Sequence, residues 1–184
     1  MKKTGWIIVG IIVVIALYVM GSYNGLVSKS QAVDSQWAQV QTQYQRRFDL
    51  IPNLVESVKG VMKQEQTIFT ALADARTHYT GAQTVDQKAV AAGQVETALG
   101  RLLAIVENYP QLKSSENVQT LMAQLEGTEN RVSVERMRFN DTVRALNVSI
   151  KTFPTNILAG MFGFTERAYF EAEAGASVAP KVTF

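Results

Sequence analysis

The stretch from Thr4 to Ser28 carries no charged residue, and this feature limits how the chain can fold. Its centre, from Trp6 to Met20, is almost wholly apolar. A helix of this length reaches roughly 38 Å, more than the hydrocarbon core of about 30 Å. We therefore predict a single N-terminal transmembrane helix. The residues that we place in the bilayer are Trp6, Ile7, Ile8, Ile12, Val14, Leu17 and Tyr18.

A cleaved signal peptide is the alternative interpretation of this stretch, with Lys2 and Lys3 as its basic start. However, the apolar run is long for a signal peptide, and residues 21–27 contain no small-residue cleavage site. The chain has no Cys, so it cannot be acylated as a lipoprotein. We favour an uncleaved anchor.

The charges that flank the span predict its orientation. Lys2 and Lys3 precede it, whereas Lys29 and Asp34 follow it. The positive-inside rule then places the N-terminus in the cytoplasm and the domain outside. The Gly21-x-x-x-Gly25 spacing would let two spans approach closely, but glycine is common in membrane helices, and we favour that simpler explanation.

The charge and composition of the chain after the span argue against several classes of partner. All 16 acidic residues follow the span, as do 16 of the 18 Lys and Arg, so this part is formally neutral and shows no nucleic-acid footprint. His78 is the single histidine, and Cys is absent. A carboxylate-bridged metal site in a bundle uses Glu-x-x-His pairs, and this sequence has none. We predict no metal, no cofactor and no nucleic-acid partner.

Apolar residues recur at steps of three or four after the span, which is typical of an amphipathic helix. The members of this first stripe are Val33, Trp37, Val40, Tyr44, Phe48, Ile51, Val55, Val58 and Met62. No helix breaker lies between residues 28 and 51, so we expect the membrane helix to continue into the domain. Pro52 should then kink or break this helix. Beyond it the pattern resumes as far as about Tyr79.

Two further helices are expected after a turn at Gly81. Residues 87 to about 108 form the second, capped by Thr84 or Asp86, and the third starts after residue 115 and ends before Pro154. The fold class is therefore all-α, with an N-terminal transmembrane helix followed by a bundle of long helices. It has three segments, or four if Pro52 breaks the first. The expected domains are an anchor at 1–28, a helical bundle at 29–170 and a flexible tail at 171–184.

Polar residues cluster in three places along these helices. The main members are Arg46, Arg47, Asp49, Asn53, Glu56, Arg101, Glu129, Asn130 and Arg131. They could form a binding site built from three helices, or an ion-pair network that fixes the helix register. We favour the structural network. Hydrolase and phosphate-loop motifs are absent, and we predict no enzymatic activity.

A glutamine-rich, nearly charge-free flank runs along the first helix from Gln36 to Gln45. It is either a solvated face or a neutral surface for other copies of the same helix. Charge normally keeps surfaces apart, so its absence permits lateral contact. We predict a homo-oligomer. Its candidate interface is Val33, Trp37, Val40 and Tyr44.

Four ordered motifs resemble the LemA family of bacterial membrane proteins. They are Arg46-Arg-Phe-Asp-Leu-Ile-Pro-Asn-Leu-Val-Glu56, Leu99-Gly-Arg-Leu-Leu-Ala104 with Glu107-Asn-Tyr-Pro-Gln-Leu-Lys113, Leu125-Glu-Gly-Thr-Glu-Asn-Arg131, and Phe153-Pro-Thr-Asn156 with Gly160-Met-Phe-Gly-Phe164. The resemblance implies an N-terminal anchor, an antiparallel helical bundle and no agreed biochemical activity. Phe48 replaces a frequent His and Phe139 a usual Tyr, and we interpret both as packing variants.

Two functions remain open on this basis. The first is a structural protein that organises partners or lipid at the bacterial inner membrane. It fits the association of one branch of the family with shaping magnetosome membranes. The second is an accessory or regulatory subunit of a membrane enzyme such as a protease or phosphatase. The expected partners are the lipid bilayer, other copies of the chain and a membrane protein.

Overall fold

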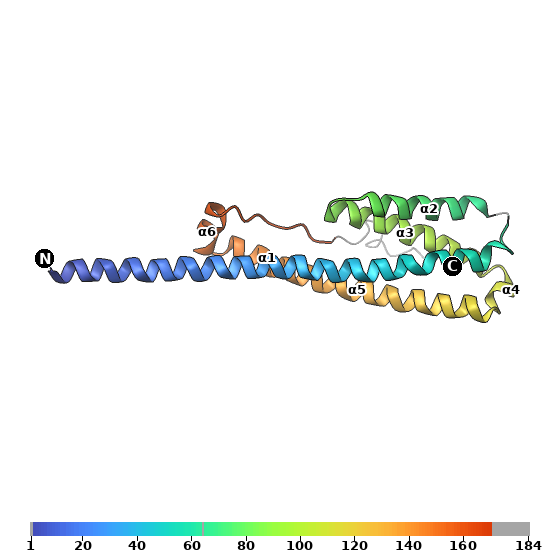
Figure 1. Ribbon diagram of the computed structural model, residues 1–184, viewed down its shortest axis with the longest axis horizontal. Helices are drawn as coiled ribbons and strands as arrows, with labels where there is room; N and C mark the ends of the chain where they lie inside the picture. Colours follow the sequence, from blue (N-terminus) through green and yellow to red (C-terminus); the bar gives the residue numbers. More distant parts are fainter. Residues whose placement is uncertain (1, 64, 171–184) are drawn as a thin grey trace, which may run out of the picture. The chain divides into compact units, whose positions relative to one another are not determined.

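A computed structural model describes residues 2–63 and 65–170, and every regular element within them is a helix. The helices, labelled in Figure 1, are α1 (Lys2–Lys59), α2 (Gln66–Gly81), α3 (Val85–Val106), α4 (Pro110–Lys113), α5 (Glu116–Lys151) and α6 (Thr155–Met161). The predicted all-α fold is confirmed. The tail predicted for residues 171–184 lies outside the described residues.

The first helix continues from the apolar stretch into the domain, as predicted, because α1 runs without interruption from Lys2 to Lys59. The sequence predicted a kink or a break at Pro52; the break is wrong, and the kink stays a prediction. Pro52 lies inside α1, between Ile51 and Leu54, whose side chains are 4% and 0% exposed. We infer that burial of these neighbours offsets the backbone hydrogen bond that proline removes.

The predicted continuation to Tyr79 is also wrong, because α1 ends before Gly60 and α2 starts only at Gln66. The buried side chain of Met62 holds the connection between them against the core. Later boundaries agree with the sequence signals. Thr84 caps α3 in a reciprocal capping box, in which Gln87 N donates to Thr84 Oγ1 at 3.2 Å and Thr84 N donates to Gln87 Oε1 at 3.3 Å.

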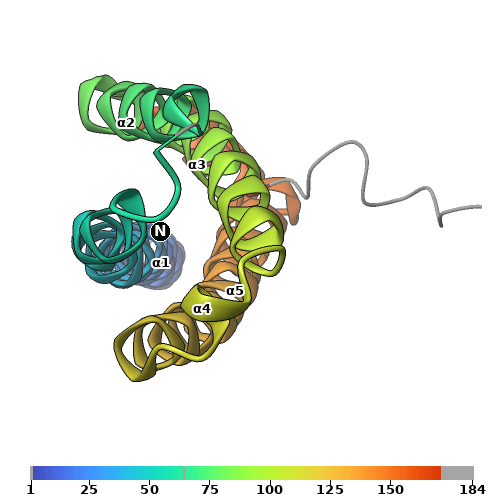
Figure 2. The same ribbon diagram turned by 90° about the vertical axis from the view of Figure 1, so that its right-hand side faces the viewer.

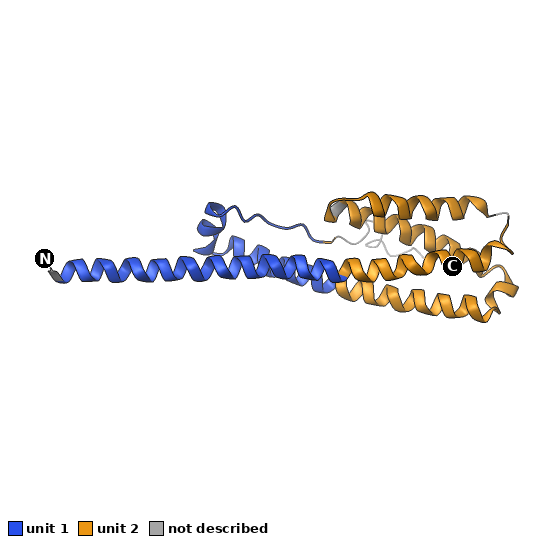
Figure 3. Ribbon diagram, in the orientation of Figure 1, with its two compact units in different colours: residues 1–39, 137–169 blue, residues 40–136, 170–184 orange. Residues whose placement is uncertain are grey.

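The chain forms two compact units, drawn in separate colours in Figure 3. Among the described residues, unit 1 combines residues up to 39 with residues 137–169, and unit 2 combines residues 40–136, without residue 64, with Phe170. Both α1 and α5 therefore contribute residues to each unit. The boundary predicted at residue 28 concerns the membrane rather than packing, and it stays a prediction.

In unit 1, α5 lies antiparallel to α1. The ring centroids of Trp37 and Phe139 are 5.4 Å apart, and Lys29 Nζ donates to Ser149 Oγ. An earlier residue of α1 therefore meets a later residue of α5, as antiparallel packing requires. The family resemblance implied this direction.

The chain after α6 returns along α5 in an extended form. Asn147 holds it through two hydrogen bonds, in which Asn147 Nδ2 donates to the Arg167 carbonyl and Arg167 N donates to Asn147 Oδ1, both at 2.9 Å. Asn147 is buried, with 5% exposure. This pairing satisfies a buried amide and ties the returning segment to the helix.

In unit 2, α3 lies between α2 and α5, and the C-terminal part of α1 lies on the side that these helices enclose (Figure 2). The core side chains with 0% exposure are Val40, Leu54, Val58, Met62, Ala92, Val95, Leu99, Leu102 and Val132. Phe48 packs edge-on against Tyr79 at 4.5 Å between centroids, so α1 contacts α2 directly.

The residues proposed as an oligomer interface need correction. Val33, Val40 and Tyr44 are 3%, 0% and 1% exposed, so they are buried within the chain itself. Trp37 is half-buried and packs against Phe139. The apolar seam of α1 faces its own bundle, because a single chain already supplies the helices that cover it.

Candidate functional site

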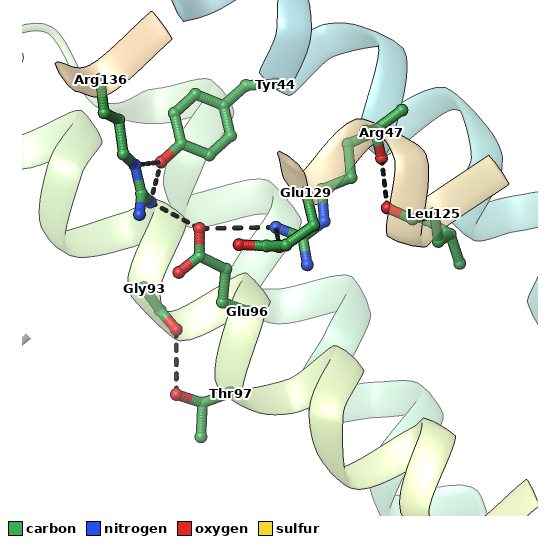
Figure 4. A network of polar contacts seen from close by, with 9 residues as sticks. Tyr44, Arg47, Gly93, Glu96, Thr97, Leu125, Glu129 and Arg136 are labelled. Atoms are coloured by element: carbon green, nitrogen blue, oxygen red, sulfur yellow. Dashed lines mark hydrogen bonds and ion pairs between the residues drawn. The ribbon is translucent and has the colours of Figure 1, made fainter. Parts of the chain in front are cut away.

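Unit 2 contains a cluster of two arginines and two glutamates drawn from three helices (Figure 4). Arg47 of α1 forms an ion pair with Glu129 of α5, and its Nη1 lies 3.5 Å from Glu96 Oε1 of α3. The same Glu96 oxygen lies 2.5 Å from Arg136 Nη2 of α5. Glu96 therefore bridges the two arginines, and the four charges sum to zero.

Tyr44 completes the cluster from α1. Its hydroxyl accepts hydrogen bonds from Nε of Arg136, at 2.8 Å, and from Nη2 of the same side chain. Tyr44 and Arg47 are three residues apart, which places them on one face of the helix. Arg136 also stacks over the Phe170 ring, with its guanidinium carbon 4.5 Å from the ring centroid.

The cluster is largely withdrawn from solvent. The side chains of Arg47, Glu96 and Arg136 are 8%, 21% and 23% exposed, while Glu129 is 44% exposed. Burial raises the pKa of Glu96 above its usual value, although Arg136 opposes this shift. Burial also raises the pKa of Tyr44. Charges from three helices therefore neutralise one another within the cluster.

The structure retains only part of the polar network expected from the sequence. Arg47 and Glu129 belong to the cluster. The other predicted members are exposed: Arg46, Asp49, Asn53, Glu56, Arg101, Asn130 and Arg131. Asp49, for example, accepts a hydrogen bond from Gln45 of its own helix at 2.8 Å. Sequence clustering grouped residues that lie close along the chain but point away from the core.

Two central members of the ion-pair cluster, Glu96 and Arg136, are absent from the network predicted from the sequence. Arg136 occupies a position in the apolar stripe of α5, between Val132 and Phe139. Glu96 directly follows Val95, which is fully buried. A charged residue within an apolar stripe was the available signal, because such a residue needs an opposite charge in the core.

His78 lies on the surface, where its Nδ1 is 3.1 Å from Gln94 Oε1. Within residues 2–63 and 65–170, no three His, Cys, Asp or Glu side chains are grouped as a metal site would require. The charges of the predicted network that come together, those of Arg47 and Glu129, pair with each other.

The apolar start of α1 is the second candidate site. Its side chains are exposed on all sides of the helix: Trp6 80%, Ile7 62%, Ile8 53%, Ile12 59%, Val14 66%, Leu17 58% and Tyr18 44%. Two described helices, α1 and α3, are long and apolar enough to cross a membrane. However, 39% of the α3 window is buried in the protein, against 0% for α1. An exposed apolar surface of this length is typical of a membrane contact.

These features define a membrane-associated, all-helical protein, and comparison with known proteins identifies its family. The LemA family model matches residues 36–184, and the chain belongs to this family. It is also similar to the magnetosome proteins MamQ 1 and MamQ 2 of Paramagnetospirillum magneticum strain AMB-1. Each is 28% identical over 187 residues, covering 88% of this chain and 68% of the relative.

A third relative is the magnetosome protein MamQ of Magnetospirillum gryphiswaldense strain MSR-1. It is 29% identical over 180 residues, which covers 83% of this chain and 66% of the relative. The family match begins at residue 36, after the apolar stretch, and it includes Arg47, Glu96, Glu129 and Arg136. The ion-pair cluster therefore lies wholly within the matched region.

Proposed function

We propose that this protein is a single-pass structural protein of the bacterial inner membrane, which organises an assembly at the membrane and has no catalytic activity of its own. One observation carries the proposal. The exposed apolar segment of α1 continues without a break into the helix that contributes Val40, Leu54 and Val58 to the core of unit 2. In this proposal, one helix serves both as the anchor and as a core helix of unit 2.

Two further observations support a structural role. The polar cluster at Glu96 pairs its charges internally, which is typical of a network that holds helices in register. The relatives are named as magnetosome proteins, and a magnetosome role for them agrees with an assembly task at a membrane. Both observations are accounted for by a structural role, without a catalytic activity.

Self-association forms part of the proposal, with a revised contact surface. The apolar seam of α1 is buried in its own bundle, but Gln39 and Gln45 on the flank are exposed. Anchoring confines copies to two dimensions with a common orientation, so that weak lateral contacts add together. The exposed part of the glutamine-rich flank is the proposed interface.

Membrane insertion and orientation are tested in cells. The protein should stay with membranes after carbonate extraction, and protease added to intact spheroplasts should digest the domain after Lys29, because Lys2 and Lys3 hold the N-terminus inside.

Ile12→Lys combined with Leu17→Lys should release the protein, since each lysine at the bilayer centre costs about 3 kcal/mol. The control is Val134→Lys with Val148→Lys, at two exposed positions of α5.

Extraction of the natural chain by carbonate would contradict the anchor. A domain that survives in spheroplasts but is cut in inverted vesicles would reverse the orientation and leave the anchor intact. Release of the control variant would show that added lysines disturb the protein generally rather than the span.

A further inference from the structure

The segment from Phe153 to Thr165, which contains α6, has no charged residue. It has one inward face, where Leu158 and Ala159 are 9% and 1% exposed. Large apolar side chains point outward from the same segment: Phe153 75%, Ile157 55%, Met161 74% and Phe162 46% exposed. Within the described chain, Phe153, Ile157 and Met161 are left more than half exposed, whereas Phe162 lies partly against Tyr23.

The segment lies beside the apolar part of α1, within unit 1 (Figures 1 and 3). Tyr18 Oη is 3.5 Å from Thr155 Oγ1, and the rings of Tyr23 and Phe162 pack edge-on with centroids 4.9 Å apart. An open apolar groove continues this contact along α1. Its lining residues are Ala16, Val19, Met20, Tyr23 and Phe162.

The part of α1 that precedes its contact with α6 is too short to cross the hydrocarbon core of a bilayer. Between Thr4 and Leu17, before the contact with α6 begins, the helix rises only about 20 Å. The hydrocarbon core is about 30 Å thick, so residues up to roughly Tyr23 are needed to cross it. The membrane therefore reaches the level at which Thr155 and Phe162 contact α1.

Charged residues mark where water begins on the other side of this level. Lys151, two residues before the uncharged segment, pairs through its Nζ with Oε2 of Glu166, directly after the segment, at 2.8 Å. Arg167 Nη2 lies 3.5 Å from Asp34 Oδ1 of α1. An apolar surface bordered by ion pairs and aromatic rings is typical of the boundary between acyl chains and headgroups.

We propose that α6 and its flanking residues, Phe153 to Phe164, form a second lipid contact that inserts into the boundary between headgroups and acyl chains, beside the span. This inference rests on the proposed membrane anchor. The contact chemistry is that of acyl chains, reached by Phe153, Ile157 and Met161. With lipid contacts on two sides, unit 1 has a defined depth and a defined rotation about α1 in the bilayer.

The absence of cysteine allows a direct test. Single-cysteine variants of the full chain, Ile157→Cys and Met161→Cys, are labelled with an environment-sensitive fluorophore and reconstituted in phosphatidylglycerol–phosphatidylethanolamine vesicles. Val14→Cys reports the span, and Met137→Cys, an apolar and 60% exposed position of α5, is the matched control. Circular dichroism confirms that each variant keeps the helical content of the natural chain.

Lipids that carry a quencher should lower the emission of labels at Val14, Ile157 and Met161 but not at Met137. Iodide in the water should quench the label at Met137 most. If iodide quenches Met161 as strongly as Met137 while Val14 responds to lipid, the anchor holds and the second contact is refuted. If labels on α6 resist both quenchers, another copy of the chain covers them, which also overturns the proposal. If Val14 itself fails to respond to lipid, the anchor is refuted.

Discussion

Tyr44 and Tyr79 belong to one aromatic cluster, with ring centroids 5.4 Å apart, but their hydroxyls have different surroundings. The Tyr44 hydroxyl accepts hydrogen bonds from Arg136. The Tyr79 hydroxyl is buried and has no hydrogen-bond partner in the described structure. Burying a polar group without a partner lowers stability by the free energy of desolvation, whereas a hydrogen bond to a partner offsets that loss.

The same substitution should therefore act differently at the two positions. Tyr44→Phe should lower the free energy of unfolding by about 1–3 kcal/mol, because it removes one acceptor of the half-buried Arg136 guanidinium. Tyr79→Phe should leave it unchanged or raise it slightly. Urea unfolding of both variants in detergent measures the difference, and an equal loss at both positions would show that the hydrogen bond to Arg136 contributes little.

We also expect Tyr79 to make the free energy of unfolding depend on pH. Burial raises its pKa from 10.0 to about 12, so the folded state holds the phenolic proton more tightly than the unfolded state. This contribution to stability is complete below pH 10 and is lost as the pH rises towards 12. The alkaline loss of stability should be smaller in Tyr79→Phe than in the natural chain.

Glu96 is the residue on which the ion-pair cluster depends, because its carboxylate contacts both Arg47 and Arg136. Glu96→Gln keeps the shape but leaves two partly buried arginines with Glu129 alone. Breaking buried ion pairs is strongly destabilising, and with the partial exposure seen here we expect a loss of about 1–3 kcal/mol.

The control for this substitution is Glu126→Gln on α5, at an exposed position. It removes the same charge and should change the free energy of unfolding by less than about 0.5 kcal/mol. Equal losses in both variants would mean that net charge, rather than the cluster, determines the effect.

At the scale of single elements, α1 contains a proline in its interior. Pro52 lies within the helix, flanked by the buried Ile51 and Leu54. Proline in a helix interior is about 3 kcal/mol less favourable than alanine, although a folded protein relaxes part of this cost. We therefore expect Pro52→Ala to raise the free energy of unfolding by about 1–3 kcal/mol.

The matched control is Asn53→Ala, at the next and exposed position, which changes helix propensity by less than about 0.7 kcal/mol. Thermal and urea unfolding, followed by circular dichroism, compare the two variants. A Pro52→Ala variant that is less stable than the natural chain would show that the local geometry at the proline is needed for packing in unit 2.

At the scale of the whole molecule, the proposed self-association depends on a neutral flank of α1. In nanodiscs, the measured protein mass of the natural chain should correspond to several copies rather than one. Gln39→Glu with Gln45→Glu places like charges on exposed positions of this flank and should lower the mass, because the charges on neighbouring copies repel.

The control for the flank is Gln66→Glu with Gln124→Glu, two exposed positions on α2 and α5, which should keep the natural mass. A monomeric natural chain at high concentration would refute self-association. An assembly that tolerates both flank charges would place the interface elsewhere, and a stoichiometric enzyme in detergent pull-downs would favour an accessory subunit.

Properties that depend on neighbouring residues were determined by the sequence. The uncharged stretch from Thr4 to Ser28 predicted an apolar start of α1, and the part from Trp6 to Tyr18 is exposed and apolar in the structure. The Thr84 capping signal and the end of α5 before Pro154 were likewise local. Caps and helix periodicity involve residues a few positions apart, so a single chain reveals them directly.

Only the tertiary structure decided which faces meet. Pro52 does not break α1, and the burial of its neighbours Ile51 and Leu54, which propensity alone does not reveal, accompanies the unbroken helix. Glu96 and Arg136 are 40 residues apart in sequence, and their partnership exists only because α3 packs beside α5. The uncovered face of α6 became visible for the same reason: Leu158 is buried and Met161 is not, a difference set by contacts between distant segments rather than by residue type.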